Sequence, residues 1–293
     1  MLDLRKASAS PPQTTMRNQL RELTEIGVLQ RRQENKFPGA VNYALTGAGR
    51  DLLAVGQVVT DWLAAAPDGP LHLGAPGAKS VIKALTDGWS TNVIRALAAR
   101  PLALTELASI ISGVSYPSLE RRLVAMRLAG QLEVTPGNGR GRPYVVTDWL
   151  RHAVAPLAAA AQWERLWAVT GVEPVARLDA EAAFLLAIPL VKIPPDVSGA
   201  CRLTVEISSG KEPRLAGVVV TVEEGRGTSC IARLKDQADA WASGSAPAWL
   251  CAVIDHDPHQ LEIGGEHSLA ASLVEGLHRA LIASRPSRSS RLN

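Results

Sequence analysis

The 293-residue chain contains few cysteines and no long apolar run. Its three cysteines, Cys201, Cys230 and Cys251, form no CxxC motif, which argues against a disulfide framework and a zinc site. No apolar stretch approaches the roughly 20 residues that a membrane-spanning helix needs. Arg5 and Lys6 are not followed by the apolar core and cleavage site of a signal peptide. We therefore expect a cytoplasmic protein with no membrane partner.

The sequence also lacks the common catalytic motifs. GxSxG, P-loop, GxGxxG and HExxH patterns are absent, and no serine has the context of a catalytic triad. The segment DHDPH at 255–259 carries carboxylates and imidazoles, but its Pro258 favours a turn, whereas a metal needs converging ligands. These absences predict a protein that is not an enzyme and holds no metal and no cofactor.

Charge is divided unequally along the chain. Residues 1–170 carry 19 Lys and Arg against 13 Asp and Glu, whereas residues 171–284 carry 9 against 15. Residues 285–293 add three arginines in a polar segment that we expect to be disordered. The first part of the chain is therefore the expected partner of a polyanion.

The first 170 residues contain a diverged internal repeat. The aligned positions are core residues and helix ends: with a shift of 103, Met16, Leu20, Leu23 and Gly27 fall on Leu119, Leu123, Met126 and Gly130. After a loop the shift becomes 101, and Tyr43, Leu45 and Thr46 fall on Tyr144, Val146 and Thr147. Agreement over more than 40 residues indicates two copies of one structural unit.

Each copy predicts a short helix, a longer helix that ends at a glycine, and a β-hairpin followed by a further helix. In the first copy these are 2–7, 13–26, 28–33 with 41–45, and 46–65; in the second they are 104–111, 118–129, 131–135 with 144–146, and 147–169. This order is that of a winged helix. The sequence thus predicts winged helices at 1–65 and 81–171, joined by a linker at 66–80.

The second copy also contains a predicted helix from Trp89 to Ala99, and its counterpart would lie before residue 1. We expect either that the start of the chain is placed too late, or that the first copy lacks this helix. In the second case it would expose apolar surface that a partner chain covers.

The helix at 13–26 has the pattern of a DNA-reading helix. Met16, Leu20 and Leu23 form one apolar stripe, and polar side chains occupy the opposite face. Arginine and asparagine side chains bind guanine and adenine edges in the major groove. An ordinary amphipathic surface helix is the alternative. The hairpins add basic residues, and an extended Arg-Gly-Arg-Pro segment suits a narrow minor groove, although a solvated hairpin tip is again the alternative.

Positions that match Thr14, Arg17, Asn18 and Arg21 are Pro117, Glu120, Arg121 and Val124 in the second copy. The second copy is therefore expected to rely on other arginines and its wing, or to serve partly as a dimerisation module. The complete predicted DNA-binding set is Gln13, Thr14, Arg17, Asn18, Arg21, Arg31, Arg32, Lys36, Ser118, Arg121, Arg122, Arg140 and Arg142.

The run MRNQLRELTEIGVLQRR and the phrase VNYALTGAGRDLL, within 16–53, resemble the HxlR-type winged-helix regulators of the MarR-like superfamily. The segment DGWSTNVIRALAARPLALTEL at 87–107 resembles the same family. The resemblance implies dimeric binding to a palindromic double-stranded DNA operator, so this chain resembles two such units fused as a pseudo-dimer. Some members sense oxidants through a cysteine near the start of the winged helix, but no cysteine precedes Cys201.

Residues 172–284 predict a separate α+β domain, with strands at 202–207, 216–223 and 229–234 and helices at 178–190 and 267–282. Their pattern resembles the sterol carrier protein type 2-like domains, which implies an apolar ligand. Large aromatic side chains suit a planar ligand, with core packing as the alternative. The predicted ligand-binding residues are Trp163, Trp167, Phe184, Trp241 and Trp249, whereas Trp62 and Trp149 are expected to pack the helices that follow each wing.

Together these patterns predict an α+β protein that acts as a ligand-responsive transcriptional regulator, a repressor that a small apolar or aromatic metabolite releases from DNA. A homodimer is a further expected assembly. The alternative function is a protein-interaction platform built on tandem winged helices, as in chromosome-segregation accessory subunits. A third interpretation is a lipid carrier in which the winged helices only form a scaffold.

Overall fold

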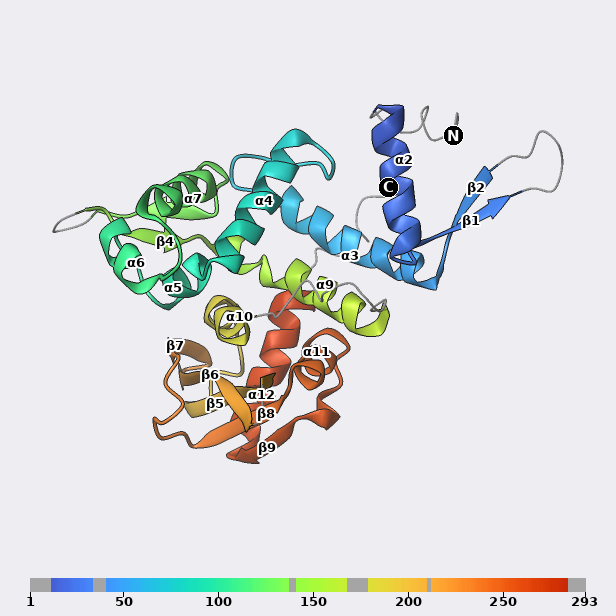
Figure 1. The fold of residues 1–293 in the computed structure, drawn as a ribbon. Coiled ribbons are helices and arrows are strands. Elements are labelled where there is room, and N and C mark those ends of the chain that lie inside the picture. The colour runs from blue at the N-terminus through green and yellow to red at the C-terminus, as the bar shows by residue number, and fades with distance from the viewer. Residues whose placement is uncertain (1–11, 34–40, 137–140, 168–178, 210–211, 284–293) are drawn as a thin grey trace, which may run out of the picture.

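The computed structural model describes residues 12–33, 41–136, 141–167, 179–209 and 212–283. Helices and strands are both present throughout, in agreement with the predicted α+β class. Figure 1 shows two lobes along the top of the molecule and a third below them. We call the lobes unit 1, unit 2 and the sheet domain.

Unit 1 consists of α2 (Gln13–Glu25), β1 (Leu29–Gln33), β2 (Val41–Leu45) and α3 (Gly47–Ala64). The helix ends because Gly27 adopts φ 75°, a left-handed conformation that glycine reaches without strain. The antiparallel hairpin pairs Leu29 with Leu45. These elements confirm the predicted helix, hairpin and following helix, whereas the predicted helix at 2–7 lies outside the described residues.

Unit 2 runs from α4 (Pro76–Ser90) and α5 (Val93–Ala99) through α6 (Leu104–Ile110) and α7 (Tyr116–Leu128) to the hairpin of β3 (Leu132–Val134) and β4 (Tyr144–Val146). It ends with α8 (Asp148–Arg151) and α9 (Val154–Trp167). The bounds of α7 are those of α2 increased by 103, as the repeat predicts.

Three predicted boundaries in this part are wrong. The single helix predicted from Trp89 to Ala99 is divided, because Asn92 adopts φ 59° between α4 and α5. The predicted linker at 66–80 ends earlier, since α4 already begins at Pro76, whose fixed φ suits a first helical turn. The helix predicted at 147–169 is two helices, α8 and α9.

Units 1 and 2 contain the same hydrogen bonds at the join between hairpin and helix. The Thr46 hydroxyl donates to the Gly27 carbonyl at 2.6 Å and accepts from the Gly49 backbone N–H at 3.1 Å. The Thr147 hydroxyl likewise donates to the Gly130 carbonyl at 3.0 Å and accepts from the Leu150 N–H at 3.1 Å. Each threonine therefore caps its helix and ties it to the glycine that ends α2 or α7.

The sheet domain contains a five-stranded sheet in the order β7-β6-β5-β8-β9, in which only β5 and β8 pair in parallel. Its elements are α10 (Ala180–Ala187), β5 (Gly199–Ser209), β6 (Glu212–Glu223), β7 (Arg226–Ile231), β8 (Ala240–Ser245), α11 (Ala246–Ile254), β9 (Glu262–Gly265) and α12 (His267–His278), with short helices at 188–190, 258–260 and 279–283. The predicted strands and helices of this part are present, with β7 beginning and ending three residues earlier. The elements β8, α11 and β9 were not predicted from the sequence.

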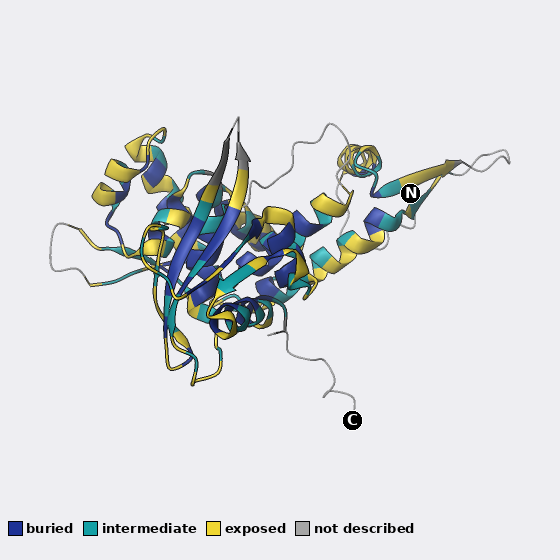
Figure 2. Cartoon of the chain, turned by 90° about the horizontal axis from the view of Figure 1, so that it is seen from below, coloured by how far each residue is buried: buried dark blue, intermediate teal, exposed yellow. Residues whose placement is uncertain are grey.

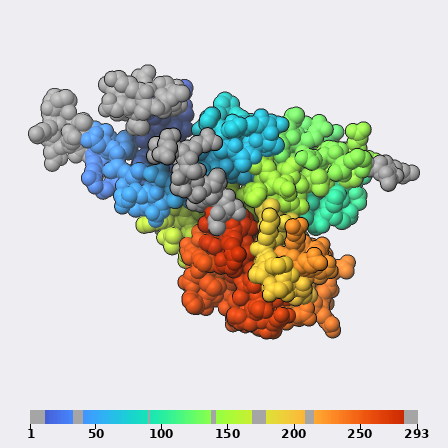
Figure 3. Space-filling view, turned by 180° about the vertical axis from the view of Figure 1, so that it is seen from behind, coloured from blue at the N-terminus to red at the C-terminus, as the bar shows by residue number. Residues whose placement is uncertain are grey.

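The core is continuous from unit 2 into the sheet domain. One cluster of buried side chains joins Leu97 and Leu123 of unit 2 to Leu186 of α10 and Val220 of the sheet. Figure 2 shows this buried material along the sheet and the central helices, whereas α2 and the β1–β2 hairpin are largely exposed. Figure 3, which views the molecule from behind, shows the sheet domain packed directly beneath unit 2. The sheet domain is thus packed on unit 2, the end of α3 joins the same core, and α2 with the β1–β2 hairpin projects from one end.

Candidate nucleic-acid interface

The exposed face of α2 carries the polar side chains predicted to read DNA. Met16 and Leu20 are buried, at 6% and 8% exposure, and they seat the helix against its neighbours. All five predicted side chains of this helix are exposed: Gln13, Thr14, Arg17, Asn18 and Arg21. Arg21 also forms an i,i+4 ion pair with Glu25 at 3.6 Å, in which both side chains remain mostly exposed. The helix therefore presents hydrogen-bonding groups and positive charge to solvent on one face.

The β1–β2 hairpin extends from the same end of the molecule (Figure 1). Arg31 and Arg32 are exposed on β1, opposite Tyr43 and Asn42 of β2. Lys36 lies outside the described residues. Because consecutive strand residues point to opposite faces of a hairpin, each face of this hairpin carries one exposed guanidinium group suited to a phosphate contact.

The corresponding face of α7 is less polar. Val124 and Leu128, at positions equivalent to Arg21 and Glu25, are exposed at 39% and 73%. Arg121 is exposed, whereas Ser118 and Arg122 are partly buried. The two helices therefore offer unequal surfaces, as the sequence predicts.

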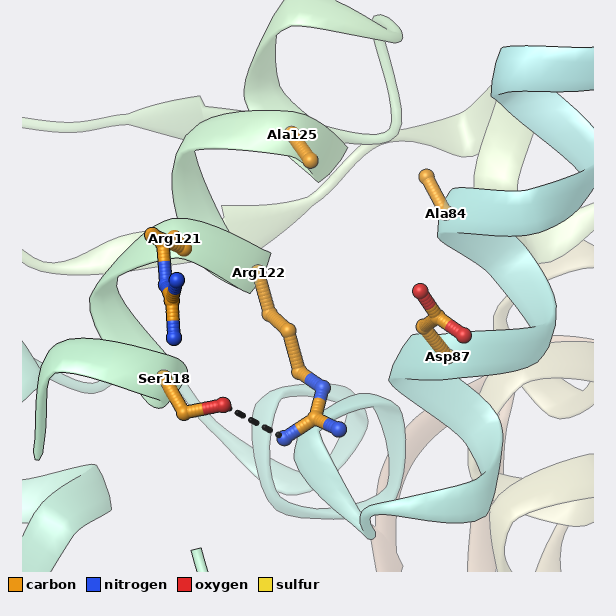
Figure 4. Close-up of a pocket in the computed structure, with 6 residues that line it drawn as sticks. All are labelled: Ala84, Asp87, Ser118, Arg121, Arg122 and Ala125. Carbon is orange, nitrogen blue, oxygen red and sulfur yellow. Dashed lines mark hydrogen bonds between the residues drawn. The ribbon is translucent and has the colours of Figure 1, made fainter. Parts of the chain in front are cut away.

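Arg122 is directed toward α4 rather than outward. Its guanidinium donates to the Ser118 hydroxyl at 3.4 Å, and both side chains line a hollow of about 230 Å³ together with Arg121 and Asp87. Figure 4 shows Arg122 reaching from α7 toward the wall that holds Asp87. Of the predicted residues of α7, Arg121 is therefore the better placed for an outward contact. Arg142 is exposed just before β4, and Arg140 lies outside the described residues.

The helices that follow the two hairpins pack against each other through tryptophans. Trp62 of α3 and Trp149 of α8 stack with ring centroids 4.6 Å apart and an interplanar angle of 8°. Each indole N–H donates to the backbone carbonyl of the other residue, at 3.0 Å from Trp62 and 2.8 Å from Trp149. Both side chains are buried, so the predicted packing role of this pair is confirmed.

A second tryptophan contact mirrors the first. The repeat shift of 101 places Trp62 on Trp163 and Ala48 on Trp149. In unit 1, Trp62 donates a hydrogen bond to the Trp149 carbonyl of unit 2. The equivalent bond in the opposite direction would run from Trp163 of unit 2 to the Ala48 carbonyl of unit 1. That bond is present at 2.9 Å. Each unit thus uses the same aligned position to donate a hydrogen bond to the other unit.

Trp163 and Trp167 are therefore engaged with unit 1. The Trp167 indole N–H donates to the Asp51 carboxylate at 3.0 Å, and its ring lies against Gly47. Both residues were predicted to bind a ligand. The shift of 101 aligns Trp163 with Trp62, however, and this alignment already indicates a place in the helix interface.

The five predicted ligand-binding residues lie in three separate places. Phe184 and Trp249 meet edge to face at 4.9 Å, both buried, and the Trp249 N–H donates to the Thr204 carbonyl at 2.7 Å. Trp241 lies on the sheet surface at 37% exposure. The prediction that they share one pocket is wrong, because Trp163 and Trp167 pack on α3 while Phe184 and Trp249 pack on each other.

Polar contacts fix the sheet domain to two helices of unit 2. Arg95 of α5 pairs with Asp179, at 3.4 Å, and with Glu181 of α10. The buried Gln162 of α9 donates to the Asp255 carboxylate at 2.5 Å, next to α11. These contacts make α9 a common wall of the helix interface and the sheet domain.

Two of the three thiols are poorly suited to redox chemistry. Burial raises the pKa of Cys201 and of Cys230 to about 12, so both remain protonated at neutral pH, and the thiolate is the reactive form. In the part of the chain that the structure describes, no cluster of three His, Cys, Asp or Glu side chains could hold a metal ion. Over the same residues, no helix is long and apolar enough to cross a membrane.

The comparisons with known proteins agree with the geometry of unit 1. Residues 1–68 match the family model described as HxlR-like helix-turn-helix. No curated protein and no solved structure matches the chain. The family match covers unit 1, where the exposed polar helix and the basic hairpin lie, and it supports a DNA-binding transcriptional regulator.

Proposed function

We propose that this protein is a transcriptional regulator in which two winged-helix units of one chain form a pseudo-dimer on double-stranded DNA. The observation that best supports this proposal is the pair of equivalent hydrogen bonds, one from Trp62 to the Trp149 carbonyl and one from Trp163 to the Ala48 carbonyl. Equivalent positions in the two units thus meet inside one chain, as they do between the subunits of a symmetric dimer. The hairpins lie at opposite ends of the molecule (Figure 1), which suits two successive contacts along a duplex.

The two contacts are unequal in this proposal. Unit 1 reads bases through Arg17, Asn18 and Arg21, because these groups are exposed on one helix face. Unit 2 contributes Arg121 and its hairpin, which contact the phosphate backbone and set the register. The preferred site is therefore one strongly specified half next to a weakly specified half.

The test measures binding of the full chain to a selected duplex and counts the chains bound. Selection from random duplexes, followed by sedimentation of the complex, is expected to give one chain per site and one conserved half-site. Two chains on a symmetric palindrome would contradict the pseudo-dimer, and the absence of any sequence preference would contradict the regulator.

The proposal includes repression and release by a small apolar compound. A compound releases DNA only if it binds the DNA-free arrangement more tightly, and α9 of unit 2 contacts both unit 1 and the sheet domain. A promoter reporter in cells with and without the gene tests the direction: expression should rise when the gene is deleted.

A protein-interaction platform is the competing function, and the exposed Val124 and Leu128 of α7 favour it for unit 2. Salt separates the two functions. DNA binding that neutralises several phosphates weakens steeply as salt rises, whereas an apolar protein interface does not.

A further inference from the structure

We infer that the outer face of α7 binds the same face of a second copy of this chain, with the two helices antiparallel. The outer face consists of Pro117, Glu120, Val124, Arg127 and Leu128, and all five side chains are exposed in the single chain. The helix lies at the surface of unit 2 (Figure 1). The face is therefore accessible to a partner without any rearrangement of the chain.

The helix α7 is apolar on two sides, whereas its counterpart α2 is apolar on one. The first apolar side of α7 is buried and holds the helix in unit 2. On the other side, Val124 and Leu128 are exposed at 39% and 73%, where α2 has Arg21 and Glu25. An aliphatic side chain that stays in water contributes little to folding. The exchange of two charged residues for two apolar ones therefore indicates a surface that another molecule covers.

The residues of the outer face form straight rows along α7. Pro117 and Val124 are seven residues apart, and so are Glu120 and Arg127. Seven residues are nearly two full helical turns, so the members of a row differ by only about 20° in rotation and lie about 10 Å apart along the axis. Rows with this spacing allow two helices to pack side by side at a small crossing angle.

The charges on this face are complementary to themselves. Glu120 and Arg127 lie on the same edge of the face, on either side of Val124, and neither forms an ion pair within the described part of the chain. Consider a two-fold axis near Val124, perpendicular to both helices. The helices then run antiparallel, and each edge of one helix meets the same edge of the other.

In this arrangement Glu120 of each copy faces Arg127 of the other copy, and the two Val124 side chains meet at the centre. Two ion pairs then flank an apolar contact, and the same symmetry brings Leu128 of each copy toward Pro117 of the other. A second copy supplies the matching charges by symmetry, whereas an unrelated protein would have to present both in the reverse order. The self-complementary charges thus favour a second copy as the partner.

The other charges near this face do not oppose the packing. Arg121 lies on the other edge, where the partner presents Leu128 and Asp68, which line the same hollow, so its guanidinium meets no like charge there. Arg122 is directed toward α4 (Figure 4), and Lys83 of α4 is held in an ion pair of 2.8 Å within its own helix.

A second copy and DNA compete for α7 in this inference, and the competition rests on the proposed function. Unit 2 is proposed to reach phosphates through Arg121, which lies beside the outer face. The dimer is therefore a DNA-free state, and it leaves one chain per DNA site. A single pair of helices is a small interface, so the dimer should be weak and should dissociate on dilution.

The test measures sedimentation of the full, DNA-free chain over a range of concentrations. The chain should pass from monomer to dimer as its concentration rises. Val124→Glu brings two carboxylates together at the centre of the interface and should weaken association about tenfold. Leu53→Glu, at an exposed leucine of α3 outside the face, is the matched control and should leave association unchanged.

Charge reversal tests whether the partner is a second copy. Glu120→Arg and Arg127→Glu each place like charges opposite one another, so each variant alone should associate about tenfold more weakly. Mixed in equal amounts, the two variants regain an attractive pair at both ends of the interface. They should therefore form a mixed dimer about as tight as that of the original chain.

A chain that stays monomeric at every concentration, single reversals without effect, or a mixture no tighter than its components would each overturn the interface. Addition of the selected duplex should convert the dimer into complexes that hold one chain. If the chain binds no duplex, the proposed function fails, while sedimentation of the free chain still decides the interface.

Discussion

Replacement of Trp62 by phenylalanine tests the interface that joins the two units. The change keeps an aromatic ring for the stack with Trp149 but removes the N–H that donates to the Trp149 carbonyl at 3.0 Å. That carbonyl then lacks its partner in a buried setting, which costs about 1–3 kcal/mol. The smaller ring also leaves a gap, so we expect the free energy of unfolding to fall by about 2–3 kcal/mol.

The measurement is urea unfolding of the full chain, with Trp241→Phe as the matched control. Trp241 is 37% exposed on the sheet surface, with its ring over Gly264, so its replacement should lower the unfolding free energy by about 1 kcal/mol or less, clearly less than that of Trp62. Trp163→Phe removes the mirrored hydrogen bond of 2.9 Å and should cost about as much as a typical buried hydrogen bond, about 1–2 kcal/mol.

Double variants provide the sharper criterion. Trp62 and Trp149 touch each other, so their phenylalanine replacements should be non-additive by about 0.5–3 kcal/mol, whereas Trp62→Phe with Trp241→Phe should be additive. The interface variants should also weaken binding to a duplex with both half-sites more than to a duplex with one. Additive effects in both pairs, or a Trp62→Phe cost no larger than that of the control, would refute the reasoning.

Three further results are expected. Arg17→Ala should weaken specific DNA binding by about 1–3 kcal/mol in a fluorescence anisotropy titration, whereas Glu120→Ala should leave it unchanged or strengthen it, and equal losses would contradict the unequal roles. Arg95→Ala should lower the free energy of unfolding by about 1 kcal/mol, because its partners on the sheet domain are mostly buried while Arg95 is 45% exposed. The raised pKa of Cys201 and Cys230, about 12 in the folded chain, predicts stability that is fully present below pH 9 and lost between pH 9 and about 12, as the thiols ionise in the unfolded chain; a flat profile of unfolding free energy over this range would contradict it.

Local elements followed from the sequence where a single residue type enforces them. Gly27 and Gly130 end their helices with φ of 75° and 71°, and Thr46 and Thr147 cap the helices that follow. The apolar stripe of α2 placed its polar residues on the exposed face. The division between α4 and α5 was not predicted. The sequence pattern there favours an uninterrupted helix, but Asn92 adopts the left-handed conformation and interrupts it.

The repeated helix and hairpin elements and the exposed surface of α2 could be predicted from the sequence, because glycine conformation, capping and apolar periodicity act within a few residues of the chain. The contacts of the tryptophans could not be predicted in this way. Trp163 and Trp167 are large aromatic residues of the kind that line ligand pockets. Their hydrogen-bond partners, Ala48 and Asp51, lie more than a hundred positions away in the sequence. The hollow of about 470 Å³ between the loop after α3, α4 and α7 likewise forms only when the chain is folded, because its walls come from segments separated in the sequence.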